Sequence, residues 1–409
     1  MQLSILINAY ACSPNMGSEP GMAWNWCINL AKHSELHIIT EGEFKEKIET
    51  ALPTLPQGKN MHFYYNPVSD EIRKMCWNQG DWRFYKYYKQ WQWKTYEMAK
   101  DIIAKQKIDI IHQLNMIGFR EPGYLWKIEN KPFVWGPVDA KEKFPTVYLQ
   151  GASLKDQLFM HLKNFITGIQ LKHDKRVRKT AKKASIIVSA SSESQKSFKK
   201  FFNINSPLLN ETGCYPQTKP LSDKKGKKEL DLLWVGKLDF RKQLALAIKT
   251  LAQLNNKKIK LHIVGGGDAT AYQQLAQSLS VDAQCIWHGS ISHDAVQKIM
   301  QQSDIFFFTS VAEGTPHVVL EAISNNLPVV CFDTCGQGDS INEKVGIKIP
   351  LSTPKQSVHD FVEKISYLYQ NKEVLQELAS NCKQRQEELS WENKAKQMVA
   401  LYNQILNGK

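Results

Sequence analysis

No stretch of this chain has the length of a membrane span. The sequence holds no run of about 18 apolar residues, which is what a transmembrane helix requires. Its first apolar segment, Leu3–Ile7, is short and has no basic leader, so we expect no signal peptide. We therefore expect a cytoplasmic protein, and peripheral contact with the inner face of the cell membrane stays open.

Cysteine and metal-ligand patterns are also missing. The eight cysteines are scattered, with no C-x-x-C pair and no histidines at zinc spacing. Cys331 and Cys335 are close in sequence, but they flank Phe-Asp-Thr after an apolar segment. We expect free thiols in a reducing compartment and no metal site. The sequence also shows no internal repeat at a solenoid period and no low-complexity tract.

The size and charge of the chain set broad limits on its class. A length of 409 residues exceeds a usual single core, and 42% of the residues are hydrophobic, so we expect two globular domains. The formal net charge of +13 favours an anionic partner. Phosphorylated small molecules, anionic lipid surfaces and nucleic acid all meet that description.

Short apolar segments alternate with helical patterns along the whole chain, which predicts βαβ units and parallel sheets. The fold class is therefore α/β with two Rossmann-like domains. A polar, lysine-rich loop at residues 219–229 separates the two sets. A helix is expected at residues 22–32 and another at 390–406, with Ser390 as its N-cap. The predicted strands are residues 3–8, 36–40, 108–112, 132–135 and 185–189, then 231–235, 260–264, 285–287, 305–308 and 327–331.

Two glutamates seven residues apart give the most informative pattern. Glu313 precedes an apolar helical run, and Glu321 lies one to two turns inside it. Pro316 suits the first turn of that helix. The amides in front of the run, around Gly314 and Thr315, favour an anion. Such a site can hold a diphosphate on the amides, a sugar against one carboxylate and a ribose diol against the other.

This E-x7-E pattern resembles the nucleotide-sugar site of the retaining glycosyltransferases of family 4, which have the GT-B fold. The resemblance covers essentially the whole chain. It implies two Rossmann-like domains that face each other across a cleft. It also implies the domain limits: 1–212 for the acceptor domain, 213–388 for the donor domain, and 389–409 for a helix that crosses back to the first domain.

A basic loop follows the first strand of the second set. The segment Val235-Gly-Lys-Leu-Asp-Phe-Arg-Lys242 resembles the family motif in which two basic residues hold the donor diphosphate. Lys242 falls on the usual lysine, and Lys237 stands where arginine is commoner, which keeps the charge but loses bidentate geometry. Gln243 replaces a usual glycine. The alternative is a solvated basic loop without function.

Two glycine-rich turns follow predicted strands. In Ile263-Val-Gly-Gly-Gly-Asp268, the resemblance places Gly265 and Gly266 near the nucleotide, although many α/β turns look similar. In the first domain, Gly17, Ser18, Glu19 and Gly21 belong to a G-S-E-P-G loop that resembles one bacterial branch of the family. That loop is expected beside the donor phosphates and the acceptor. The alternative is an ordinary strand–helix turn.

Two further positions concern the transferred sugar and the acceptor. The resemblance makes His112, at the end of a predicted strand, a candidate catalytic residue that contacts the sugar. Many relatives have His-x-His here, whereas this chain has Leu114 at the second place. A hydrogen-bonded core histidine is the equal alternative. The segment Trp135-Gly-Pro-Val-Asp139 resembles a W-G-P-V-G motif, with Asp139 and Ala140 in place of the usual glycines.

No D-x-D pair occurs, so a cation bound in the GT-A manner is not expected. Lysines and helix amides would neutralise the leaving diphosphate instead, and we predict no metal and no cofactor. Two segments, 82–94 (aromatic and basic) and 172–183 (strongly basic), suit an anionic membrane surface, RNA or a solvated helix face. The membrane and solvated alternatives are equal for the first segment, and the solvated one is favoured for the second.

The sequence thus predicts a retaining glycosyltransferase that moves a sugar from a nucleotide-diphosphate sugar to a hydroxyl acceptor, in bacterial surface polysaccharide assembly. Its partners would be the donor, a sugar or lipid-linked saccharide acceptor and an anionic membrane, with no nucleic acid. A non-catalytic nucleotide-sugar or anionic-polymer binding protein on the same scaffold is the main alternative. Nucleic-acid binding and a sugar phosphorylase are weaker ones, because no nucleic-acid motif and no pyridoxal phosphate signature is present.

Overall fold

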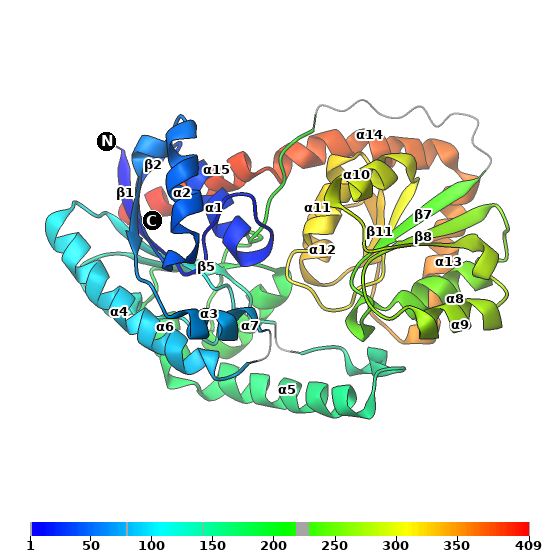
Figure 1. Ribbon diagram of the computed structural model, residues 1–409, viewed down its shortest axis with the longest axis horizontal. Helices are drawn as coiled ribbons and strands as arrows, with labels where there is room; N and C mark the ends of the chain where they lie inside the picture. Colours follow the sequence, from blue (N-terminus) through cyan, green and yellow to red (C-terminus); the bar gives the residue numbers. More distant parts are fainter. Residues whose placement is uncertain (1, 79–80, 142, 218–228, 409) are drawn as a thin grey trace. The chain divides into compact units, whose positions relative to one another are not determined.

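The computed structural model describes residues 2–78, 81–141, 143–217 and 229–408. Contacts divide the chain into two compact units, shown in Figure 1. Unit 1 consists of residues 1–142, 168–212 and 391–409, and unit 2 consists of residues 143–167 and 213–390. The loop predicted at 219–229 lies, except for its last residue, outside the described residues.

Unit 1 contains a six-stranded parallel sheet with the order β3-β2-β1-β4-β5-β6. Helices cover both of its faces. Its strands are β1 (Leu3–Ala9), β2 (Ser34–Thr40), β3 (Met61–Tyr65), β4 (Ile110–Asn115), β5 (Phe133–Val138) and β6 (Ile186–Ser189). Its helices are α1 (Ser18–Leu30), α2 (Lys45–Ala51), α3 (Asp70–Trp77), α4 (Phe84–Lys105), α6 (Lys175–Lys183), α7 (Ser192–Phe202) and α15 (Trp391–Leu406).

Unit 2 repeats this topology with the order β12-β11-β10-β7-β8-β9. Its strands are β7 (Leu230–Val235), β8 (Ile259–Val264), β9 (Cys285–Gly289), β10 (Ile305–Phe308), β11 (Val329–Phe332) and β12 (Gly346–Ile349). Its helices are α8 (Leu244–Leu254), α9 (Thr270–Ser278), α10 (His293–Gln302), α11 (His317–Ser324), α12 (Cys335–Ser340), α13 (Pro354–Gln370) and α14 (Lys372–Glu388). Helix α5 (Leu154–His173) has residues in both units.

Alternation along the strands builds a core on each face of both sheets, because successive side chains of a strand point to opposite faces. In β1, Ile5 and Ile7 belong to the cluster that includes Trp26 of α1, whereas Leu6 belongs to the cluster that includes Trp91 of α4. In β7, Leu232 packs toward α8 and α13, and Leu233 packs toward α11. These buried strands confirm the α/β prediction.

The final helix packs within unit 1. The rings of Trp391 and Trp26 meet edge to face at 5.8 Å, and Lys394 Nζ donates to the carbonyl of Asn210 at 3.3 Å. The predicted helix is confirmed, and its residues Met398 and Tyr402 are fully buried in the cluster around α1.

Residues 143–167 group with unit 2, whereas the sequence-based division put them in the N-terminal domain. The contacts of Tyr148 give the physical reason: its hydroxyl bonds Ser357 Oγ at 2.7 Å, and its ring meets that of Phe332 at 5.5 Å. The domain limits 1–212, 213–388 and 389–409 stay a prediction in other respects.

Candidate active site

Each sheet has a topological switch point, where the first and fourth strands of the unit are neighbours and the chain leaves them in opposite directions. In open α/β sheets, ligands bind outside the carboxyl ends of the strands at such a point. In unit 2 the point lies between β7 and β10, so the loops at residues 236–243 and 309–316 border it. The predicted donor residues Lys237, Lys242, Gly314 and Thr315 belong to these loops, and Glu313 does as well.

Lys242 and Glu313 meet at this switch point. Lys242 Nζ lies 2.5 Å from Glu313 Oε1, and Ser310 Oγ donates to the same oxygen at 2.5 Å. The ammonium also lies 5.4 Å from the ring centre of Phe308, the last residue of β10. Exposed fractions of 19% for Lys242 and 16% for Glu313 leave both side chains partly open to solvent. The pair can therefore meet a small charged ligand.

Hydrogen bonds to the backbone hold the Lys242 loop against β10. Thr309 Oγ1 donates to the carbonyl of Lys242 at 2.8 Å, and Trp234 Nε1 donates to Thr309 Oγ1 at 3.0 Å. Both Trp234 and Thr309 are buried. A buried network of this kind fixes the position of the lysine with little freedom left to the loop.

Gln243 occupies the position where the family usually has glycine. Its backbone is left-handed, with φ 53° and ψ 42°, a conformation that favours glycine. The side chain anchors it, because Nε2 donates to the carbonyls of Tyr148 at 2.7 Å and Phe240 at 2.6 Å. The glutamine thus adopts the backbone conformation that suits a glycine and adds two bonds within unit 2.

Lys237 is exposed in the same loop, directly after Gly236. The glycine-rich turn after β8 lies against this loop: Leu238 N donates to the carbonyl of Gly266 at 2.9 Å. A Cβ at Gly265 would lie 1.8 Å from the carbonyl oxygen of Gly236, so the two loops require glycine there. This contact gives Gly265 a structural role, and the predicted nucleotide contact of Gly265 and Gly266 stays a prediction.

Helix α11 begins at His317, so Pro316 is its N-cap and not a residue of its first turn. Proline fixes φ but leaves ψ free, and Pro316 has an extended ψ of 117°. The carbonyl of Gly314 accepts from the amide of Gly336 at 2.9 Å, and a Cβ at Gly336 would lie 2.5 Å from Thr315 Cα. The turn before α11 is therefore held by α12.

Glu321 is the fifth residue of α11, as predicted, and its exposed fraction is 32%. Its partners come from α10: Gln297 Nε2 donates to Oε2 at 3.2 Å, and His293 Nε2 lies 3.6 Å from Oε1. The carboxylate is accessible and oriented by these neighbours, which suits a hydrogen bond to a diol.

The switch point of unit 1 lies between β1 and β4, and the predicted G-S-E-P-G loop borders it. Glu19 Oε1 accepts from the amide of Ile117 at 3.1 Å, after the end of β4. Burial raises the pKa of Glu19 to about 7, although the Ile117 amide opposes the rise. A Cβ at Gly21 would lie 1.7 Å from the carbonyl oxygen of Met16, whereas the space around Gly17 is open, and Ser18 begins α1.

His112 is fully buried in β4. Its Nε2 lies 2.5 Å from the carbonyl oxygen of Gly136, which can only accept, so Nε2 carries the proton. Nδ1 then accepts from the hydroxyl of Tyr402 at 2.6 Å. Burial lowers the pKa of His112 to about 4, so the ring is neutral at pH 7. These contacts favour the alternative of a hydrogen-bonded core histidine.

Asp139 and Ala140, which stand in place of the usual glycines, lie directly after β5. Asp139 Oδ1 accepts from the amide of Lys141 and from Ser194 Oγ, both at 3.2 Å, and the amide of Ala140 donates to Ser194 Oγ at 2.9 Å. Burial raises the pKa of Asp139. The two residues tie the end of β5 to the first turn of α7, within unit 1.

Sequence reasoning missed three residues that position Glu313. Ser310 bonds its carboxylate, Cys335 Sγ accepts from its amide at 3.4 Å, and Gln337 Nε2 donates to the carbonyl of Ser310 at 3.1 Å. Only the position of Ser310, three residues before Glu313, could have been recognised from the sequence as close to the carboxylate. Cys335 and Gln337 come from α12, which the sequence does not link to this loop.

One group of side chains in the described residues has the proximity of metal ligands. Ligand atoms of Glu35, His37 and His62 lie within 4.8 Å of one another on β2 and β3. His62 Nε2 already lies 3.0 Å from Glu35 Oε1, and His37 Nδ1 lies 3.0 Å from Tyr64 Oη. None of these residues belongs to the predicted site, and the absence of a metal requirement stays a prediction.

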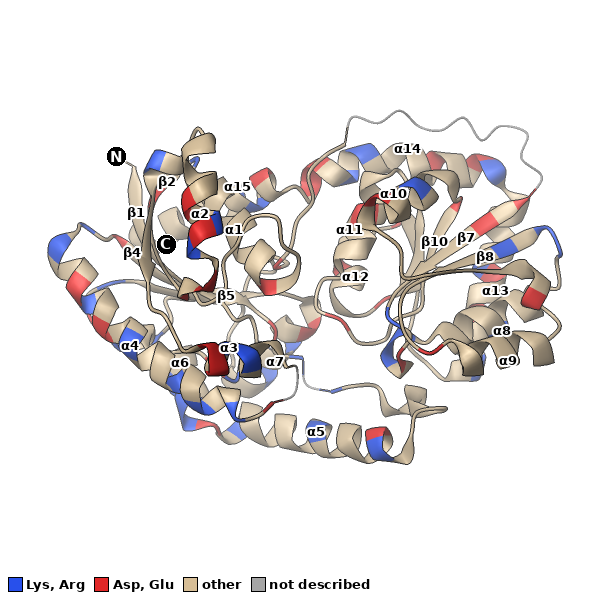
Figure 2. Ribbon diagram, viewed as in Figure 1, with Lys and Arg blue, Asp and Glu red and all other residues tan. Residues whose placement is uncertain are grey.

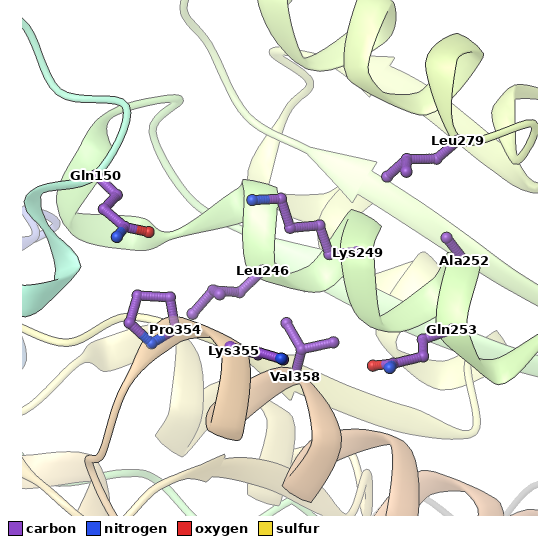
Figure 3. A pocket seen from close by; sticks show the side chains of 9 residues that line it. All are labelled: Gln150, Leu246, Lys249, Ala252, Gln253, Leu279, Pro354, Lys355 and Val358. Atoms are coloured by element: carbon purple, nitrogen blue, oxygen red, sulfur yellow. The ribbon is translucent and has the colours of Figure 1, made fainter.

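A hollow of about 570 Å³ lies elsewhere in unit 2 (Figure 3). Side chains of α8 and α13 line it, among them Lys249 and Val358. It contains none of the predicted site residues, so it is distinct from the switch-point site.

Two parallel six-stranded sheets with helices on both faces, each with its switch-point loops, define the GT-B class of folds. The solved structure of the lipopolysaccharide outer core galactosyltransferase WaaB has the same fold, with a TM-score of 0.66, 15% identity and coverage of 99% of both chains. Anabaena HepE in complex with UDP-glucose is also similar, with a TM-score of 0.56, 14% identity and coverage of 98% of this chain and 100% of that one.

Residues 218–387 of the chain match the model of the glycosyl transferases group 1 family. A curated relative is the lipopolysaccharide 1,6-galactosyltransferase of Salmonella typhimurium, which is 32% identical over 135 residues, or 32% of this chain and 37% of the relative. The matches to other curated relatives also cover less than half of the length of each relative.

Proposed function

We propose that this protein is a retaining hexosyltransferase that moves a sugar from a nucleotide-diphosphate sugar, a UDP-sugar in the first instance, to a hydroxyl acceptor. The meeting of Lys242 and Glu313 at the switch point of unit 2 carries this proposal. Both residues lie inside the region that matches the family. A cation and a carboxylate on one small surface suit a donor that presents a diphosphate beside a sugar.

In this proposal, Lys242 and Lys237 hold the diphosphate, and the turn at Gly314 and Thr315 caps it. Glu321 binds the ribose hydroxyls, for which its exposed carboxylate is suited. Gly265 and Gly266 bring the backbone close to the nucleotide. Because the two lysines and the amides neutralise the leaving diphosphate, no metal or cofactor is required.

Retention follows if the acceptor attacks the same face of the sugar that the phosphate leaves. The bond between the anomeric carbon and the phosphate oxygen breaks, a bond to the acceptor oxygen forms, and the acceptor proton passes to the departing phosphate. Glu313 lies at the sugar and stabilises the positive charge that develops on it. In unit 1, the loop with Gly17, Ser18, Glu19 and Gly21 serves the acceptor and the phosphates.

We assign the acceptor to bacterial surface polysaccharide, as a sugar or a lipid-linked saccharide. Two similar proteins support this, the lipopolysaccharide 1,6-galactosyltransferase and WaaB. A lipid-linked acceptor and the net charge of +13 both favour a peripheral position at the inner face of the cell membrane. Among the described residues, no helix has the length and apolar character to cross a bilayer.

A thermal-shift screen with UDP, GDP, ADP and their common sugars tests the donor site. A ligand that binds only the folded protein raises the melting temperature. Stabilisation by one nucleotide that is lost in Glu321→Ala, and kept in the exposed control Glu343→Ala, would support the donor site and name its base. A folded sample that responds to none of them would favour the non-catalytic alternative. Product anomers, read by NMR, test retention.

A further inference from the structure

Helix α5 carries a continuous row of exposed, large apolar side chains. Their exposed fractions run from 42% to 85%, values ordinarily found for polar surface residues. Seven residues form this row, which we name the α5 face: Leu154, Leu158, Phe159, Leu162, Phe165, Ile166 and Ile169.

The α5 face is a single stripe of the helix. At about 100° per residue, its seven members fall within an arc of about 140°. Met160, Thr167 and Leu171 are buried on the opposite side, where they pack the helix against the protein. The helix is therefore apolar on two sides, and its packing explains only one of them. Isolated apolar residues are common on protein surfaces, but an ordered row of seven marks a contact surface.

Positive charge accompanies this stripe. Residues 154–183, which comprise α5, Asp174 and α6, contain nine Lys and Arg residues against two Asp residues. Figure 2 shows the sparse charges of α5, where Lys155, Lys163 and Lys172 are exposed. On α6 the exposed basic residues are Lys175, Arg178, Lys179, Lys182 and Lys183.

We propose that the α5 face docks the protein on an anionic lipid surface. Apolar side chains of a surface helix enter the boundary between headgroups and acyl chains, while lysines and arginines next to them bind lipid phosphates. The exposed Lys155, Lys163 and Lys172 of α5, against the one carboxylate of Asp156, are the charge complement of such a surface. This inference deepens the proposed function, on which its biological role rests, by naming the segment that makes the membrane contact.

A second copy of the chain fits this surface less well. In a symmetric dimer through the α5 face, two copies of a helix that carries three lysines and one aspartate would lie against each other, and their like net charges oppose such a pairing. The aromatic segment at residues 82–94 is also a weaker candidate. Tyr88 and Trp91 of α4 are buried in the core of unit 1, so much of that aromatic character serves packing.

Flotation of the full-length protein with lipid vesicles tests the proposal. Vesicles of phosphatidylcholine alone are compared with vesicles that also contain phosphatidylglycerol. We expect binding to the anionic vesicles, and a loss of at least about tenfold in the double variant Leu158→Asp/Phe165→Asp. Tyr367→Asp, on α13, is the matched control, because Tyr367 is 46% exposed and lies outside the α5 face. This control should bind as the wild type does.

Three results would overturn the proposal. In the first, the wild type does not bind anionic vesicles. In the second, the double variant binds them as well as the wild type does. In the third, light scattering shows that the wild type is a dimer and that the double variant is a monomer. The last result would assign the α5 face to a second copy. The stabilisation by nucleotide is measured in parallel: if the double variant keeps it, a loss of vesicle binding concerns the docking surface and not the donor site or the fold.

Discussion

Lys242 and Glu313 lie 71 positions apart in sequence, yet Nζ of the first is 2.5 Å from Oε1 of the second. The sequence motifs assign them to different parts of a donor, the diphosphate and the sugar. Their contact places both residues at one point of the fold. In the proposed donor complex, a diphosphate would share the ammonium with the carboxylate, so a substitution of either residue would change the charge that the other presents.

Glu313→Ala should abolish sugar transfer while the protein stays folded. Removing a group that stabilises charge in the transition state lowers the rate by roughly 10²- to 10⁴-fold. Glu313→Gln can still accept the Ser310 hydrogen bond but lacks the charge, so we expect a similar loss. Turnover of UDP-sugars and the far-UV spectrum are the measurements. Transfer close to the wild-type rate in either variant would refute the role of Glu313, and Glu343→Ala serves as the control.

Lys242→Ala should weaken UDP binding by roughly 10- to 100-fold, or about 1.4–2.8 kcal/mol, the value of a charge-assisted contact with phosphate. Lys237→Ala should have a smaller effect, because Lys237 is exposed and water screens its charge. Calorimetric titration with UDP measures both. Lys249→Ala, at an exposed lysine of α8 beside the hollow of Figure 3, should bind UDP normally. Equal affinities of all three variants would argue against a diphosphate at this loop.

Gln243 allows a test of backbone conformation by a matched pair. Gln243→Ala and Gln243→Gly both remove the two bonds from Nε2, but only alanine keeps a Cβ in the left-handed region. We expect alanine to lower the free energy of unfolding by about 1–2 kcal/mol more than glycine does. Urea unfolding measures the difference. Equal stabilities of the two variants would show that the left-handed conformation has no cost here.

The pKa of about 7 for Glu19 predicts a pH dependence of stability. Between the ordinary value of 4.5 and about 7, the folded protein holds a proton that the unfolded chain has lost. This bound proton contributes to the free energy of unfolding. The contribution is complete below pH 4.5, and the free energy of unfolding falls by about 1–3 kcal/mol as the pH rises to 7.

Glu19→Gln should remove that slope and so gain stability relative to the wild type as the pH rises. Its amide oxygen can still accept from the Ile117 amide. Chemical unfolding from pH 4.5 to 8 measures the difference between the two proteins. Glu46→Gln, at an exposed position of α2, is the control and should follow the wild type. A constant difference between Glu19→Gln and the wild type at all pH values would show that Glu19 titrates normally.

The sequence predicted ten strands, among them the edge strands β6 and β9, but missed β3 and β12 at the other edge of each sheet. Central strands of a parallel sheet are buried on both faces, so apolar runs such as Ile305–Phe308 identify them. The edge strand Met61–Tyr65 contains His62, and Gly346–Ile349 contains a lysine, which weakens the apolar signal. The α5 face was missed for a related reason: Met160 and Leu171 give the helix a second apolar side, and periodicity alone does not tell which side is packed.

The local motifs also predicted the residues of the switch-point loops, because their spacing follows from the strand ends. The local motifs could not predict contacts between segments that are distant in sequence. The bond from Cys335 to the amide of Glu313 and the anchoring of Gln243 by Tyr148 depend on which loops the sheet brings together. Such contacts decide how rigidly Glu313 and Lys242 are held, and they are visible only in the folded chain.

Tyr402→Phe separates the two interpretations of His112. The variant removes the donor to Nδ1 and leaves that buried nitrogen without its 2.6 Å partner, so the free energy of unfolding should fall by about 1–3 kcal/mol. If His112 only joins β4 to α15, the transfer rate of the folded variant stays unchanged. If its ring contacts the sugar, the altered orientation lowers kcat. Urea unfolding and initial rates, with Tyr367→Phe as the exposed control, distinguish the two; we expect lower stability with an unchanged rate.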